Sequence, residues 1–157
     1  AGMGYAVAKG NPKNVNPDDL CGLNVAVETG TVEEDAINET AKQCKADGKK
    51  DITIQSSKQQ TDATTAVVTG KADVFFADSP VVGYAIAQTE GQLEQLGKDF
   101  DSVPNAIAIK KGDSQTTEAV QKAIQKLMDD GTYKKILDTW GVSSDAVDKA
   151  EINPSVE

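Results

Sequence analysis

Strands and helices alternate along most of this chain, and the alternation restricts the folds that it can adopt. Residues 23–27 form an apolar run of the length typical of a buried strand, and a glycine turn and a helix follow it. Strands over residues 52–54 and 74–77 are each followed by a helix in the same way. Strands that alternate with helices across short connections form a mainly parallel sheet, which helices flank on both faces. The sequence therefore predicts an α/β fold.

Helix boundaries are marked by residues that cap helices. Thr31 and Glu34 form a capping box ahead of an apolar stripe. Two further helices are expected over residues 62–69 and 80–88, and Ser79 is expected to cap the second of them. Each helix thus follows a strand and returns the chain to the start of the next one.

The C-terminal part of the chain has a different pattern. Apolar residues recur at helical spacing over residues 119–128 and again over residues 133–140, and Gly131 separates the two stripes. These are two amphipathic helices whose apolar faces need a partner surface. Ahead of them, residues 106–110 predict a strand that returns toward the start of the chain.

Charge and composition exclude several classes of function. The chain carries 25 acidic residues against 16 basic ones, which gives a net charge of −9, and it contains no arginine and no histidine. A nucleic-acid partner needs a basic surface that neutralises phosphates, so none is expected. Without histidine an imidazole metal site is impossible, and the two cysteines do not make a zinc site. We therefore expect no metal and no cofactor.

A candidate binding edge lies where the predicted strands end. Thr29, Gly30 and Thr31 stand between a strand and a helix, so unpaired backbone N–H groups and the positive end of the helix dipole face this edge. A carboxylate group is the natural ligand for such a turn. A simpler explanation, in which Gly30 only permits the turn and Thr31 only caps the helix, accounts better for a junction of this kind taken alone.

Acidic and amide side chains fall on the same edge. Asp78 follows the strand over residues 74–77, and its carboxylate suits an ammonium group. Capping of the next helix explains Asp78 equally well. Gln59 and Gln60 also reach this edge and can bond a polar ligand group, although exposed loop glutamines are the better explanation for them in isolation. Helix amides together with the Asp78 carboxylate match a zwitterion, which is a more specific prediction than either part.

No catalytic residue is predicted. The acidic pairs are neighbours in sequence, such as Glu33 and Glu34, and neighbours on a helix do not face each other as paired catalytic carboxylates must. The sequence therefore favours a binding protein over an enzyme.

Segments in order along nearly the whole chain resemble the family 3 extracellular solute-binding proteins, which serve polar amino-acid ABC importers. The segments that carry the resemblance are residues 6–11, 19–22, 25–31, 70–74, 77–80, 107–113, 130–137 and 140–141. The resemblance implies one lobe of a type II periplasmic-binding-protein fold with C-terminal amphipathic helices. It assigns residues 1–9 to a hinge strand, 10–105 to the second lobe, 106–112 to the return hinge strand, and 113–157 to helices and a tail that pack on a first lobe.

The resemblance also implies a function and a ligand set. Such proteins capture a free amino acid in the periplasm, or as cell-surface lipoproteins, and deliver it to a membrane permease. The amino-acid carboxylate is bound by Thr29, Gly30, Thr31 and the amide of Val32, and the ammonium group by Asp78. An N-terminal half-lobe carries the rest of the site. A dehydratase for prephenate or arogenate and a sensor ligand-binding domain share the fold and are the alternatives.

Cys21 and Cys44 are predicted to form a disulfide. Cys21 precedes a strand and Cys44 lies near the end of the helix that runs back antiparallel to it, so the two residues meet on the same side of the lobe. An exported protein permits this bond. Closing a loop of this length stabilises the fold by about 3 kcal/mol in the chain-entropy model.

The chain on its own is expected to bind amino acids weakly and to associate with itself. Half of a two-lobed site leaves one face of the ligand in water, where charge pairing contributes little. The apolar stripes of the tail helices favour a homodimer over folding back onto the lobe, because folding back needs a complementary apolar surface.

Overall fold

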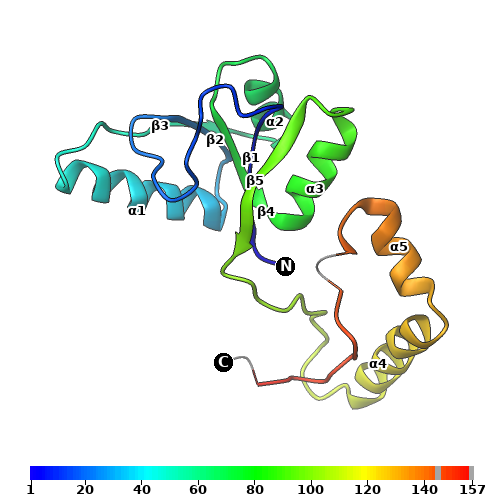
Figure 1. Cartoon of the computed structure of the whole chain (residues 1–157). Helices are drawn as coiled ribbons and strands as arrows, with labels where there is room; N and C mark the ends of the chain where they lie inside the picture. The colour runs from blue at the N-terminus through cyan, green and yellow to red at the C-terminus, as the bar shows by residue number, and fades with distance from the viewer. Residues whose placement is uncertain (144–145, 156–157) are drawn as a thin grey trace. The chain divides into compact units, whose positions relative to one another are not determined.

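The computed structural model describes residues 1–143 and 146–155. The chain divides into a lobe, Gly2–Ser102, and a tail unit that consists of Ala1 and Val103–Glu157. In chain order (Figure 1) the lobe contains β1 (Met3–Ala8), β2 (Asn24–Glu28), α1 (Val32–Ala46), β3 (Thr53–Ser57), α2 (Gln60–Val68), β4 (Val74–Asp78), α3 (Ser79–Gln88) and β5 (Leu93–Phe100). This order confirms the predicted α/β class.

The strands of the lobe form one sheet in the order β3-β2-β4-β1-β5. β2 is parallel to β3 and β4, whereas β1 runs antiparallel to β4 and β5. All strands except β1 therefore share one direction, as a mainly parallel sheet predicts, and the reversal of β1 makes the sheet mixed. The sequence could not reveal this reversal, because a strand buried on both faces has the same apolar composition in either direction.

Helices cover both faces of the sheet (Figure 1). On one face, Ile37 of α1 belongs to the same buried cluster as Val25 and Val27 of β2. On the other face, Val67 of α2 shares a cluster with Ala26 of β2. Alternate residues of β2 thus enter opposite cores, because successive side chains of a strand point to opposite faces.

The start of α1 contains the predicted cap by Thr31, but Glu34 bonds to the Gly30 amide and not to the Thr31 amide that a capping box uses. Thr31 Oγ1 accepts a hydrogen bond from the Glu34 amide at 3.2 Å, and Glu34 Oε2 accepts one from the Gly30 amide at 2.7 Å. Gly30 has a φ of 81°, in the left-handed region that favours glycine. The turn between β2 and α1 is therefore held by its own side chains and amides.

The helices α2 and α3 both begin earlier than predicted. α2 starts at Gln60, and α3 starts at Ser79, so the N-cap residue of α3 is Asp78 and not Ser79. Ser79 instead bonds to the start of β1. Its amide donates to the Gly2 carbonyl at 2.7 Å, and its hydroxyl accepts from the Gly2 amide at 3.1 Å. Both Asp78 and Ser79 have side chains that suit a cap, and only the contact with Gly2 distinguishes them.

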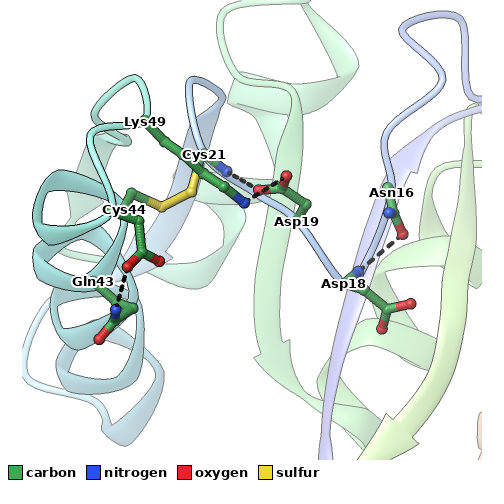
Figure 2. A network of polar contacts seen from close by, with 8 residues as sticks. Asn16, Asp18, Asp19, Cys21, Gln43, Cys44 and Lys49 are labelled. Atoms are coloured by element: carbon green, nitrogen blue, oxygen red, sulfur yellow. Dashed lines mark hydrogen bonds and ion pairs between the residues drawn. A yellow bond between two sulfur atoms is a disulfide. The ribbon is translucent and has the colours of Figure 1, made fainter.

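The predicted disulfide is confirmed between Cys21 and Cys44, whose Cα atoms are 5.7 Å apart. Figure 2 shows it joining the segment before β2 to the last turns of α1. Beside it, Asp19 accepts a hydrogen bond from the Cys21 amide at 3.3 Å and forms an ion pair with Lys49 at 3.0 Å. The disulfide and the ion pair both tie the end of α1 to the same loop.

The tail unit contains the two predicted helices, α4 (Ser114–Asp129) and α5 (Thr132–Trp140), which contact each other. Asp113 caps α4 by accepting a hydrogen bond from the Thr116 amide at 3.0 Å. No residue within either helix is buried, and 54% of Trp140 is exposed. The apolar stripes are thus only partly covered by the residues that the structure describes. None of the described helices is long and apolar enough to cross a bilayer.

The strand predicted over residues 106–110 is absent from the described part of the tail unit. Residues 103–110 are neither helix nor strand, and a turn follows at Lys111 and Gly112. A strand forms only where a neighbouring strand completes its hydrogen bonds, and the described residues offer none here. The hinge roles of residues 1–9 and 106–112 stay predictions.

Candidate functional site

Three strand ends lie side by side at one edge of the lobe. β2 lies between β3 and β4 and is parallel to both, so the carboxyl ends of the three strands share this edge. A helix begins beyond each of them, since α1 follows β2, α2 follows β3 and α3 follows β4. The structure thus brings Thr29, Gln60 and Asp78 to one edge, as the sequence predicted.

Two of the amides predicted to bind a carboxylate are already bonded within the lobe. The Thr29 amide donates to the Ser57 carbonyl at 2.8 Å, which extends the ladder between β2 and β3. The Gly30 amide donates to Glu34 Oε2 at 2.7 Å. This bond, with one from the Ser56 hydroxyl, holds the pKa of the Glu34 carboxyl below its ordinary value. Thr29 therefore offers a ligand only its hydroxyl, and Gly30 has no amide to offer.

The first turn of α1 retains donors for a ligand. The Thr31 hydroxyl donates to the Glu28 carbonyl at 2.8 Å and accepts from the Glu34 amide, so capping occupies it. Of the described hydrogen bonds, none uses the backbone N–H of Thr31 or Val32. These amides stand at the positive end of the α1 dipole, which favours an anion. A carboxylate at this edge would be bound there.

Two buried side-chain oxygens of the described residues lack a hydrogen-bond partner, namely Glu33 Oε1 and Gln60 Oε1. Glu33 is the second residue of α1, and Gln60 is the first residue of α2. Buried polar atoms of folded proteins nearly always have a partner. Both exceptions lie in first turns that begin at the candidate binding edge.

The side chains of Glu33 and Asp78 interact at this edge. Asp78 is exposed and makes no side-chain capping bond to α3, so capping does not explain it. Glu33 is only 3% exposed, and burial raises the pKa of its carboxyl above the ordinary value. Hydrogen bonds from the backbone N–H of Glu33 and from the Thr31 side chain oppose this rise in pKa, whereas the charge of Asp78 and a hydrogen bond with Asp78 add to it. Two carboxyl groups held together in this way favour a cation between them.

Glu33 is the candidate functional residue that the sequence did not identify. It stands beside Glu34 and Asp35 in a first turn, where the helix dipole favours acids in any protein. Only the packing of α1 against β4 brings Glu33 to Asp78. The sequence contains no signal of that contact, because it joins residues far apart along the chain.

A family model matches most of the chain. Residues 6–143 match the model described as bacterial extracellular solute-binding proteins, family 3. The chain belongs to this family. The resemblance inferred from the sequence segments is thereby confirmed.

Curated relatives of this family 3 chain are named for the amino acids that they bind. The arginine-binding protein ArgT of Corynebacterium glutamicum is 38% identical over 154 residues, which cover 98% of this chain and 50% of the relative. The lysine/arginine/ornithine-binding periplasmic protein of Escherichia coli is 30% identical, over 82% of this chain and 50% of the relative. The chain therefore spans about half the length of these relatives.

Solved structures of amino-acid-binding proteins are similar in fold to this chain. An ancestral arginine-binding protein bound to arginine has a TM-score of 0.67 at 28% identity, and the match covers 89% of this chain and 60% of that one. An ancestral amino-acid-binding protein, described as a precursor of cyclohexadienyl dehydratase, has a TM-score of 0.65 at 28% identity over 90% of this chain and 57% of that one. These matches confirm the predicted single lobe of a type II periplasmic-binding fold.

Proposed function

We propose that this lobe forms half of an amino-acid binding site in the extracytoplasmic component of an ABC importer. The observation that carries the proposal is the edge of strand ends, where free helix amides lie near a carboxylate. An α-amino acid has an anionic and a cationic group on one carbon atom, so it needs both kinds of partner close together. The family and the amino-acid-binding relatives support the same conclusion.

Each predicted site residue has a role in this proposal. The ligand carboxylate accepts hydrogen bonds from the amides of Thr31 and Val32, and the Thr29 hydroxyl is an additional donor. The ligand ammonium group is bound by the Asp78 carboxylate. Gln60 Oε1, which has no partner among the described residues, accepts a hydrogen bond from a polar group of the ligand side chain. Gly30 contributes the turn and not a ligand contact.

A second lobe is proposed to complete the site. Thr29, Gly30 and Asp78 are exposed, so a ligand bound only to this edge keeps one face in water. Charge pairs in water contribute little to affinity, whereas a lobe that closes over the ligand by a hinge motion excludes water from them. The relatives are about twice as long as this chain, which is the length that two lobes require.

The proposed location is outside the cytoplasm, in the periplasm or on the cell surface as a lipoprotein, and the proposed partner is a membrane permease. The family consists of extracellular proteins, and relatives from Escherichia coli are named periplasmic. The disulfide suits an oxidising compartment. No catalytic role is proposed, and an assay of the complete protein with prephenate and arogenate tests this, since turnover would contradict it.

Replacing Asp78 by Asn in the complete, two-lobed protein tests the proposed site. A thermal-shift screen of the standard amino acids identifies the ligand, and calorimetry then measures the affinity. Asp78→Asn should remove most of the affinity, because a desolvated ammonium group loses its charged partner at a cost of several kcal/mol. Asp35→Asn is the matched control, since Asp35 is an exposed acid in the first turn of α1.

An unchanged dissociation constant in Asp78→Asn would refute Asp78 as the ammonium partner. If Asp78 only capped α3, Asp78→Asn would bind amino acids normally and keep its folding stability, because Asn caps a helix about as well as Asp does. The two outcomes therefore separate binding from capping.

A further inference from the structure

We propose that residues 146–150 form a releasable strap, which α4 and α5 hold by its backbone and which covers one side of their apolar surface. The strap and both helices belong to the tail unit, so the inference does not depend on the amino-acid site of the lobe. Neither helix contains a buried residue, and the strap supplies part of the cover that they have. When the strap opens, the covered side becomes accessible to a partner.

α4 holds the strap with two glutamines that lie one helical turn apart. The side-chain amide of Gln121 donates a hydrogen bond to the Ala150 carbonyl at 2.9 Å, and Gln125 Oε1 accepts one from the Ala150 amide at 3.0 Å. Residues four apart lie on the same face of a helix, so both side chains reach the same residue of the strap. They bind its N–H and its C=O together, as a paired strand does.

α5 adds a third contact with the backbone of the strap. The Tyr133 hydroxyl accepts a hydrogen bond from the Val147 amide at 3.3 Å. The charged side chain of Lys149 instead forms an ion pair with Glu151 of the same C-terminal segment at 3.1 Å. The three hydrogen bonds from the helices thus use backbone groups, which any residue other than proline provides.

The strap covers one side of α5 and leaves another side open. Tyr133 and Leu137 lie one turn apart and are half-buried, and Val147 of the strap lines the same cavity as they do. Met128 at the end of α4 is half-buried and lines this cavity too. Ile136 points away from Leu137 by about 100° and remains 49% exposed.

Packing beneath the strap is incomplete. A cavity of about 320 Å³ remains where Leu137 of α5 faces Ala146 and Val147 of the strap, and 50% of Val147 is exposed. A segment that fills no core gains little from dispersion contacts. Its attachment therefore depends on three hydrogen bonds, each of which contributes modestly. Such a segment opens locally far more readily than a buried strand does.

Hydrogen exchange of the 157-residue chain, followed by NMR, tests whether the strap both closes and opens. The Val147 and Ala150 amides should exchange about 10- to 100-fold more slowly than in a free peptide of residues 146–155. They should exchange much faster than the amides of β2, which is buried in the lobe. An Ala150 amide that exchanges at the rate of the free peptide would overturn the closed strap, and one as slow as the amides of β2 would overturn its release.

Trypsin cleavage after Lys149 tests the two glutamines. Gln121→Ala should accelerate this cleavage by about fivefold, because the loss of one hydrogen bond raises the open fraction of the strap. Gln115→Ala is the matched control, since Gln115 is exposed in the first turn of the same helix, and it should be cleaved at the wild-type rate. Equal cleavage rates in wild type and Gln121→Ala would overturn the role of Gln121.

Ala150→Pro removes the amide that Gln125 binds, whereas Ala150→Ser keeps it. The proline variant should show faster exchange at Val147 and stronger fluorescence of a dye that binds exposed apolar surface, because Tyr133 and Leu137 lose their cover. The serine variant should behave as the wild type does. If Ala150→Pro releases Val147 and the dye fluorescence stays unchanged, the strap does not cover an apolar surface and that part of the proposal is wrong.

Discussion

Residues of one helical turn at the start of α1 have different roles. Thr31 caps the helix with its hydroxyl, Glu34 holds the Gly30 amide, and Glu33 is buried toward Asp78. Successive residues of an α-helix point about 100° apart, so neighbours in sequence face different surroundings. The division of roles follows from that rotation.

Replacing Thr31 by Ala should separate capping from ligand binding. The variant loses the acceptor of the Glu34 amide, so its free energy of unfolding should fall by about 1 kcal/mol in urea denaturation. Its affinity for an amino acid should change little, because the proposed contact is the Thr31 amide. Thr40→Ala is the control, since the Thr40 hydroxyl donates to the Ala36 carbonyl within the same helix at 3.0 Å. A large loss of affinity in a folded Thr31→Ala protein would contradict the assignment.

At the scale of single residues, the sequence predicted an interaction correctly where the two partners lie close together along the chain. The bond between Thr31 and the Glu34 amide spans one turn, and a capping box is visible in the sequence. The contact of Glu33 with Asp78 joins two elements that lie far apart in the chain, so no spacing of residues in the sequence predicts it. The true cap of α3 depended in the same way on the bond between Ser79 and Gly2.

At the scale of elements, strands and helices were predicted wherever their own residues contain the signal. Apolar runs, caps and helical spacing located β2, α1, α4 and α5. The prediction of a strand over residues 106–110 was wrong, because a strand also needs a neighbouring strand to complete its hydrogen bonds, and the segment itself gives no sign of one. The predicted disulfide was confirmed, because one strand and the helix that follows it bring Cys21 and Cys44 together.

Removing the disulfide should weaken the lobe without changing its fold. A Cys21→Ser, Cys44→Ser double variant should lose about 3 kcal/mol of unfolding free energy, since the unfolded chain regains the freedom of the closed loop. Lys49→Met tests the neighbouring ion pair with Asp19 and should cost less than about 1 kcal/mol, as surface pairs do. Mass spectrometry of the intact protein without reductant detects the disulfide as a mass lower by two hydrogen atoms. Two thiols that react with an alkylating reagent in the folded, unreduced protein would contradict the disulfide.

At the scale of the whole molecule, the exposed apolar residues of the tail unit are expected to determine whether this chain, on its own, is a monomer or a dimer. Leu127, Ile136 and Trp140 are 39%, 49% and 54% exposed. An apolar surface of this kind rarely stays uncovered on a soluble monomer. We expect a homodimer through α4 and α5 in sedimentation equilibrium, with weak amino-acid binding because half of the site is open to water.

Ile136→Glu should shift this dimer to monomer, whereas Lys135→Glu, a charge change at its exposed neighbour, should not. A wild-type chain that is monomeric at all concentrations and binds amino acids with micromolar affinity would contradict both the dimer and the open half-site.

The sequence by itself determined the α/β class, the family, the disulfide, and the edge that carries Thr29, Gln60 and Asp78, because periodicity, caps and strand ends are local properties of the chain. Only the tertiary structure decided the direction of β1, the groups of the turn that remain for a ligand, and the pairing of Glu33 with Asp78. Each of these depends on which distant elements pack together. Burial, which raises the pKa of the Glu33 carboxyl, exists only after that packing has formed.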